Sequence, residues 1–114
     1  MKAAVTDPLA VASPETRQLY EHLLGRLKSL GPFQVEKKKT CVHLARATAF
    51  AGVHLRKQFL ILTIKAAQPI QSDRIVKAEQ TSRNRWHLDV CVATKKDVDA
   101  TLVGWLERAY ELCG

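Results

Sequence analysis

Eight lysine and arginine side chains in the middle of the chain are the residues best suited to hold a ligand. They stand in short groups, and they are Lys37, Lys38, Lys39, Arg56, Lys57, Lys77, Arg83 and Arg85. Arginine offers a planar fork that can hold phosphate or carboxylate by two hydrogen bonds, whereas lysine offers a mobile point charge. If the turns that carry Arg56-Lys57 and Arg83-Arg85 meet at one end of a sheet, they form an anion site. The alternative, that these charges only keep the surface soluble, stays open.

Histidine and cysteine would permit metal binding. His43 and His87 fall on the polar sides of their predicted strands, near Cys41, Asp89 and Cys91. A zinc site needs about four such ligands at one point. Residues four apart on a strand, such as His87 and Cys91, lie about 13 Å apart. We therefore expect no metal and no cofactor. His87 stands beside Arg85 and can still titrate near neutrality within a ligand site.

The motif Glu36-Lys37-Lys38 has the Glu-x-Lys form of half of a metal-dependent nuclease site. That chemistry needs a second carboxylate to hold the metal. The nearest upstream acids, Glu21 and Glu15, fall on a predicted helix, and the lysines would repel a cation. The chain also lacks a glycine-rich phosphate loop and a nucleophile elbow. These observations favour a binding module over an enzyme.

Generic binding of single-stranded nucleic acid is weakly supported, because it uses exposed aromatic side chains on which bases stack. The chain has two Trp, two Tyr and three Phe, and the predicted core uses most of them. Trp86 alternates with apolar residues, which predicts that it is buried.

The length of 114 residues suits one domain, and we predict a flexible N-terminal arm over 1–12 followed by a domain over 13–114. The formal net charge is +7, and it is unevenly spread. Residues 31–96 hold thirteen Lys and Arg against four Asp and Glu, whereas residues 97–114 hold one against four. Three cysteines without a close pair suit a reducing compartment, and no apolar run could cross a bilayer, so we expect a cytoplasmic protein.

Residues 50–65 form the most apolar segment, and their composition predicts two strands that turn over near Arg56-Lys57 and form the middle of a sheet. Ahead of them, Ser13-Pro14-Glu15 predicts the start of a helix that Gly31-Pro32 ends. The charged run after Phe33 is typical of an edge strand or a turn. Further strands are predicted over 41–46, 75–81 and 85–93, the last with the clearest alternation.

Thr94-Lys95-Lys96-Asp97 resembles a capping box ahead of a closing helix. The apolar residues that this helix would bury are Val98, Leu102, Trp105, Leu106, Ala109 and Leu112. The whole pattern predicts an α+β fold of two layers, with an N-terminal helix, about five mainly antiparallel strands and a C-terminal helix.

Several segments together resemble the DUF5655 family, a small bacterial and archaeal domain without an established function. They are Leu30-Gly31-Pro32-Phe33, Val35-Glu36-Lys37-Lys38-Lys39-Thr40, residues 48–57, Arg74-Ile75-Val76-Lys77, Asn84-Arg85-Trp86-His87 and residues 102–111. Members of that family occur alone, beside another short uncharacterised domain, or attached to nuclease-like and predicted transport proteins. The helix–sheet–helix order is also similar to YjbR/MmcQ-type domains, which have a frataxin-like layout and are suggested to bind DNA.

We take Arg56, Lys57, Arg85, His87, Lys77 and Lys38 as the candidate ligand-binding residues. The leading hypothesis is a non-enzymatic binding module whose basic sheet end takes nucleic acid, a nucleotide or phosphate. One alternative is an accessory domain that binds another protein or a second copy of itself. Another is a domain that binds a small molecule between sheet and helices. No membrane partner is expected.

Overall fold

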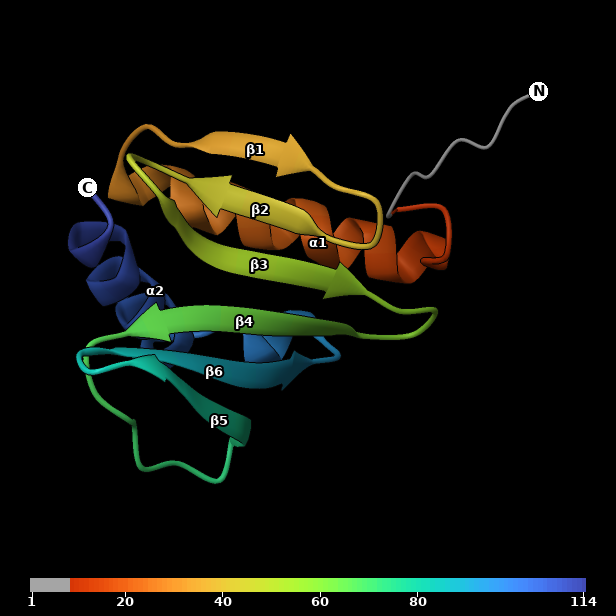
Figure 1. Cartoon of the computed structure of the whole chain (residues 1–114). Helices are drawn as coiled ribbons and strands as arrows, with labels where there is room; N and C mark the ends of the chain where they lie inside the picture. The colour runs from red at the N-terminus through yellow and green to blue at the C-terminus, as the bar shows by residue number, and fades with distance from the viewer. Residues whose placement is uncertain (1–8) are drawn as a thin grey trace.

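The chain folds as a helix, six strands and a second helix, with the order that the sequence predicts (Figure 1). The computed structural model describes residues 9–114. The helices are α1 (Pro14–Leu27) and α2 (Ala100–Leu112), with short 3-10 helices η1 (Lys28–Leu30) and η2 (Lys95–Asp97). The strands are β1 (Gln34–Lys37), β2 (Val42–Ala45), β3 (Ala49–Leu55), β4 (Leu60–Ala66), β5 (Ile75–Ser82) and β6 (Arg85–Val92). The predicted α+β class is confirmed.

All the strands pair antiparallel in one sheet, in the order β1-β2-β3-β4-β6-β5. Residues 50–65 supply most of β3 and β4, which lie at the centre as predicted. The predicted count of about five strands is wrong, because the sheet has six. The additional strand is β1, in the charged run, where Glu36 pairs with His43 and Lys37 with Val42. An edge strand tolerates such charges because its outer side faces water.

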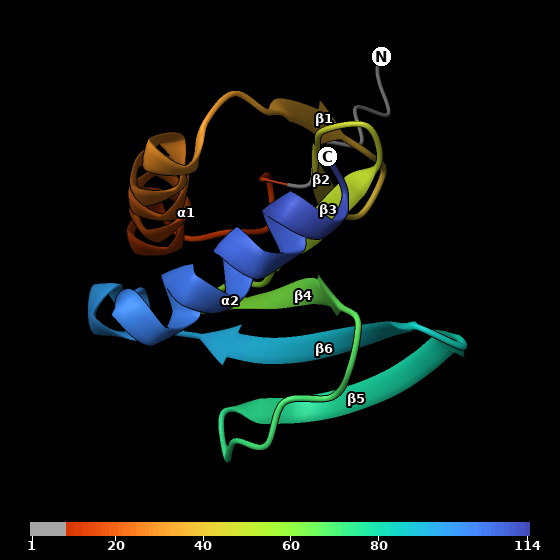
Figure 2. The same cartoon turned by 90° about the vertical axis from the view of Figure 1, so that its left-hand side faces the viewer.

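Both helices cover one face of the sheet, and the other face has no helix over it (Figures 1 and 2). Helix α2 packs on β3 and β4. On the covered face, the inner strands present apolar side chains that are almost completely buried: Val42, Leu44, Val53, Leu55, Leu60, Leu62, Ile64, Leu88, Val90 and Val92. Trp86 lies on the same side of β6 but is half-buried, not fully buried as predicted. The core therefore occupies a single layer between sheet and helices.

The helical segment formed by α1 and η1 begins and ends at the residues that the sequence predicts, Ser13 and Gly31. Ser13 Oγ accepts the backbone N–H of Thr16 at 3.3 Å, and proline takes the first helical position. Gly31 has a φ of 133°, and an added Cβ there would lie 2.5 Å from the hydroxyl oxygen of Tyr110. That hydroxyl donates to the carbonyl of Pro32 at 2.7 Å, so the segment that follows η1 is tied to α2.

The closing helix begins later than its capping box suggests. The box at Thr94 and Asp97 is present, but it caps η2. Helix α2 then has its own N-cap at Asp99, whose carboxylate accepts the N–H of Leu102 at 3.0 Å. The guanidinium of Arg74 donates two hydrogen bonds to the Asp99 carboxylate, at 3.0 and 3.1 Å. The break between the two helical segments is therefore held from the loop before β5.

The predicted arm over 1–12 lies partly outside the described residues. Within the described part, Ala12 is buried in the core and donates its N–H to the carbonyl of Leu9 at 3.1 Å. Whether 1–12 is flexible stays a prediction. No helix in residues 9–114 has the length and apolar character needed to cross a membrane.

Candidate functional site

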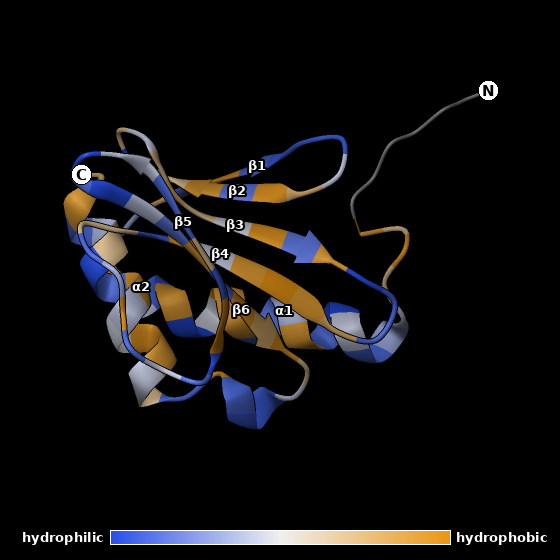
Figure 3. Ribbon diagram, turned by 60° about the horizontal axis from the view of Figure 1, so that its bottom comes forward, coloured by the Kyte–Doolittle hydropathy of each residue, from blue (hydrophilic) through white to orange (hydrophobic). Residues whose placement is uncertain are grey.

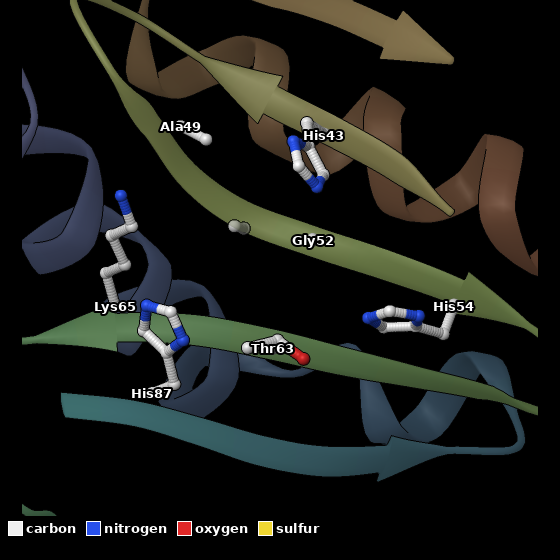
Figure 4. Close-up of a pocket in the computed structure, with 8 residues that line it drawn as sticks. His43, Ala49, Gly52, His54, Thr63, Lys65 and His87 are labelled. Atoms are coloured by element: carbon white, nitrogen blue, oxygen red, sulfur yellow. The ribbon is translucent and has the colours of Figure 1, made fainter. Parts of the chain in front are cut away.

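The open face of the sheet carries a shallow hollow of about 290 Å³ (Figure 4). Its volume lies at the lower end of the roughly 300–1,000 Å³ that is typical of small-molecule sites. Four strands line it, and the lining residues are His43, Ala49, Ala51, Gly52, His54, Thr63, Lys65 and His87. In β4 and β6 the lining residues alternate with residues that face the core. The pairing of β2 with β3 shifts register near Ala49, and there Ala49 and Ala51 also border the hollow.

The strand register decides which side chains are neighbours in the hollow. His43, Gly52, Thr63 and Asp89 form one row across β2, β3, β4 and β6. Lys65 pairs with His87 in the next row on the same face. Side chains directly opposite each other in antiparallel strands have Cβ atoms about 4.5–5.5 Å apart. The hollow is therefore built by residues that are distant in sequence and adjacent in the sheet.

Gly52 leaves the floor of the hollow empty. A Cβ added there would lie 3.8 Å from His43 Cδ2, 3.9 Å from Thr63 Cβ and 4.0 Å from His54 Nε2. These are ordinary van der Waals distances, so the glycine is not required by crowding, and it has no positive φ. A glycine inside a strand costs stability and often marks a close approach of a ligand or another backbone. Three side chains thus surround a space that an alanine would begin to fill.

Among the polar side chains of the hollow, one has a hydrogen-bond partner in the described chain and four do not. Thr63 donates its hydroxyl proton to the Asp89 carboxylate at 2.7 Å. By contrast, within residues 9–114 the rings of His43, His54 and His87 and the ammonium of Lys65 have neither a hydrogen bond nor an ion pair. All four of these side chains are half-buried. They therefore keep their hydrogen-bonding capacity for water or a ligand.

His54 is shifted toward its neutral form. Desolvation by burial lowers the pKa of His54 below its ordinary value of 6.5, and the charges of Arg56 and His43 lower it further, while Asp89 acts in the opposite direction. The ring is accordingly neutral at physiological pH and can both donate and accept a hydrogen bond.

Two neighbouring hairpin turns form a second candidate region, which we call the basic turns. The β1–β2 turn carries Lys38 and Lys39 directly after Lys37, and the β3–β4 turn carries Arg56 and Lys57. All five side chains are exposed, and both turns are hydrophilic in Figure 3. The single ion pair among them in the described chain joins Lys38 Nζ to Glu36 at 3.7 Å, between half-exposed partners. Such a surface pair contributes about 0–1 kcal/mol.

Backbone hydrogen bonds hold the basic turns in place. The N–H of Lys38 donates to Cys41 and that of Arg56 to Phe59, each at 2.8 Å. The carbonyl of Lys57 also accepts the N–H of Ser13 and the hydroxyl of Thr16, both at 2.9 Å. The second turn is therefore anchored to the first residues of α1.

The structure divides the predicted site residues among three places. Lys38, Arg56 and Lys57 share the end of the sheet that holds the basic turns. Arg85 begins β6 at the opposite end, because Val92 at the other end of this strand is the partner of Leu60. Eight strand residues span about 23 Å. The condition for a shared anion site, that Arg56-Lys57 and the Arg83-Arg85 turn meet at one end of the sheet, is therefore not met.

The two remaining predicted residues lie on the open face. His87 lines the hollow, with Lys65 opposite it on one side and Glu79 on the other. Lys77 pairs with Asp89 on the edge strand β5 and lies outside the lining of the hollow. That these residues bind a ligand stays a prediction.

Sequence reasoning missed four residues of this face: Gly52, His54, Thr63 and Lys65. A signal was present, because 52 and 54 alternate with buried residues in β3, and 63 and 65 do so in β4. Alternation of this kind places them on the face away from the core, but it does not show that both strands turn that face toward His43 and His87.

Nothing in the described part of the chain is arranged as a metal site, since no group of three or more His, Cys, Asp or Glu could hold an ion. The histidines of the hollow surround a space, and they do not converge on one point. Cys41 and Cys113 are buried and Cys91 is exposed, and none of the three forms a disulfide.

A fold of two helices on one face of an antiparallel sheet, with a shallow hollow on the other, defines a small α+β domain. A family model described as a domain of unknown function, DUF5655, matches residues 5–113. The chain therefore belongs to this family, as the sequence segments predicted. No curated protein matches the chain, and no solved structure matches it.

Proposed function

We propose that this domain is a non-enzymatic binding module whose basic turns contact an anionic partner, specifically the backbone of a nucleic acid. The observation that supports the proposal most is the gathering of Lys37, Lys38, Lys39, Arg56 and Lys57 in two adjacent turns. These cations are exposed, and the internal ion pair of Lys38 is weak. Apart from the Lys38–Glu36 pair, these side chains make no hydrogen bond or ion pair within residues 9–114.

The spacing of the turns favours an extended partner over a compact one. The two turns are separated by two strand spacings, or about 10 Å. One small phosphate offers a single point of contact, whereas one strand of a duplex advances about 3.4 Å along the axis per charge and presents about three phosphates over this length. Lysine, which supplies most of the cations, suits backbone contacts because it acts as a point charge without a geometric requirement.

We expect the basic turns to contact the phosphates of the nucleic acid and not its bases. The strands of the open face carry no Phe, Tyr or Trp on that face within residues 9–114, so a stacking platform of the usual kind is absent from the described sheet. Binding by the basic turns is therefore expected to depend strongly on salt and weakly on sequence.

Two double variants with equal loss of charge test the proposal. Arg56→Ala/Lys57→Ala removes two cations from the basic turns, and Arg83→Ala/Arg85→Ala removes two from the turn at the opposite end of the sheet. We expect the first to weaken binding of a short fluorescent oligonucleotide by about tenfold or more and to reduce the slope of log K against log salt by about two. The control variant should change affinity by less than about twofold. Fluorescence anisotropy over a salt series measures both quantities.

Equal loss in the two variants, or no binding by the native protein at low salt, would overturn the proposal. The exposed edge of the sheet would then be the surface to test for a protein partner or a second copy of the chain. Val76 on edge strand β5 is 62% exposed there.

A further inference from the structure

The hollow on the open face has the composition of a ligand site that is separate from the basic turns. Its side chains come from β2, β3, β4 and β6, and those of His43 and His54 point toward Gly52 in Figure 4. The face is not used for packing, because both helices lie on the other side. We propose that the hollow binds a small organic anion, a phosphate or carboxylate that also carries a hydroxyl or amino group.

The anionic part of the ligand follows from the donors that lack partners. Lys65 is the cation among the lining residues, and within the described chain its ammonium pairs with no carboxylate. His87 lies directly opposite Lys65, and its ring can add an N–H donor. Lys65 and His87 are cross-strand partners on the open face, and a phosphate or carboxylate held by both would gain charge-assisted hydrogen bonds.

The donor group of the ligand follows from the acceptors in the next row. The hydroxyl proton of Thr63 is engaged in the hydrogen bond to Asp89, so towards a ligand the Thr63 oxygen can only accept a hydrogen bond. The second carboxylate oxygen of Asp89 receives no hydrogen bond from residues 9–114. A plain anion such as acetate would meet these acceptors without satisfying them. A hydroxyl or amino group next to the anionic group would satisfy them.

Because Gly52 has no side chain, the centre of the hollow is empty and a ligand group can occupy it. An alanine would meet His43, Thr63 and His54 at 3.8–4.0 Å, which the backbone and neighbours can accommodate. Substitution at this position is therefore expected to fill the hollow while the fold remains intact. This property makes residue 52 a test of occupancy that does not depend on removing a polar group.

The experiment observes the imidazole signals of the full chain by NMR while a probe is added at constant pH above neutrality. The probes are glycerol 3-phosphate, glycerate and, as the neutral control, glycerol. We expect one of the two anions to shift the signals of His43, His54 and His87 in a saturable way, and the tighter of the two identifies the headgroup. Glycerol should leave the signals in place.

Matched variants locate the binding in the hollow. Lys65→Gln removes the cation of the hollow, and Lys95→Gln removes an exposed lysine of η2 that lies outside it. We expect Lys65→Gln to weaken binding of the anion at least tenfold and Lys95→Gln to weaken it less than twofold. Gly52→Val should abolish binding while the unfolding temperature and the remaining spectrum stay near those of the native protein.

Three results would overturn the inference: no saturable shift with either anion, an equal effect of the two lysine variants, or equal binding of glycerol. The inference goes beyond the proposed function and does not depend on it. Arg56→Ala/Lys57→Ala should bind the small anion like the native protein, and Lys65→Gln should bind the oligonucleotide like the native protein.

Discussion

The covered and open faces of the sheet are built from alternate residues of the same strands. In β4, Leu62 and Ile64 point to the helices and are at most 1% exposed, while Ile61, Thr63 and Lys65 point away from them and stay half-buried. The covered face consists of aliphatic side chains in contact with one another. The hollow on the open face is lined by three histidines, a lysine, a threonine and a glycine, with two alanines at its border. The difference shows that one face supplies stability and leaves the other free to hold unpaired polar groups.

The largest expected effect separates the two faces with one substitution on each. Leu62→Ala should lower the free energy of unfolding by about 2–5 kcal/mol, because it leaves a cavity in the core. Ile61→Ala removes as many carbon atoms from the adjacent position and should cost about 1 kcal/mol, mainly through lower strand propensity. Urea unfolding measures both values. Similar costs at the two positions would contradict the division between the faces.

A smaller effect tests whether the covered face also depends on polar anchors. Tyr110→Phe removes the hydroxyl that donates to the Pro32 carbonyl and should cost about 0.5–1.5 kcal/mol in urea unfolding. The ring itself remains, with its edge-to-face contact to Phe50 at 5.4 Å between centroids. Tyr110→Leu serves as the comparison, because it removes the ring as well and should cost more. An unchanged stability of Tyr110→Phe would mean that the hydrogen bond to Pro32 adds nothing to the packing of the ring.

The smallest expected effect is a change in the pH dependence of stability, and it arises from His54 on the open face. The pKa of His54 lies below 6.5 in the folded chain, chiefly through burial and then through Arg56. As pH falls below neutrality, the unfolded chain takes up a proton at this ring before the folded chain does, so stability declines down to the folded pKa. His54→Gln should therefore show a flatter decline in that range. Denaturation midpoints between neutral and mildly acidic pH measure the difference, and parallel profiles would contradict it.

Much of the fold was predictable because local patterns decide it. Ser13 and Gly31 mark the limits of the first helical segment by their hydrogen bonding and backbone angles, which are properties of a few adjacent residues. The alternation from Arg85 onward decides which side of β6 faces the core. The boundary of α2 was harder, because the break before Asp99 depends on Arg74, a residue far away in sequence.

The candidate site was predictable only in part, because its geometry depends on pairings between strands. The sequence showed that Arg56-Lys57 and Arg83-Arg85 fall in turns, but not that these turns lie at opposite ends of the sheet. The end of the sheet at which a turn lies depends on the direction of the strands that it joins, and in an antiparallel sheet the direction reverses from each strand to its neighbour. The additional strand β1 lies upstream of both turns and does not alter their relation. The hollow likewise needs the register of β3 against β4, which alternation within each strand does not contain.

The position of β6 between β4 and β5 has a consequence for the order in which the chain folds. The β1–β2, β2–β3, β3–β4 and β5–β6 pairs are each joined by a turn of a few residues, whereas the β4–β6 pair, with Ala66 opposite Trp86, closes a much longer segment. Closing a longer segment costs more chain entropy and slows the search. The sheet is thus expected to form as a four-stranded meander and a separate hairpin, whose joining along β4 and β6 sets the folding rate.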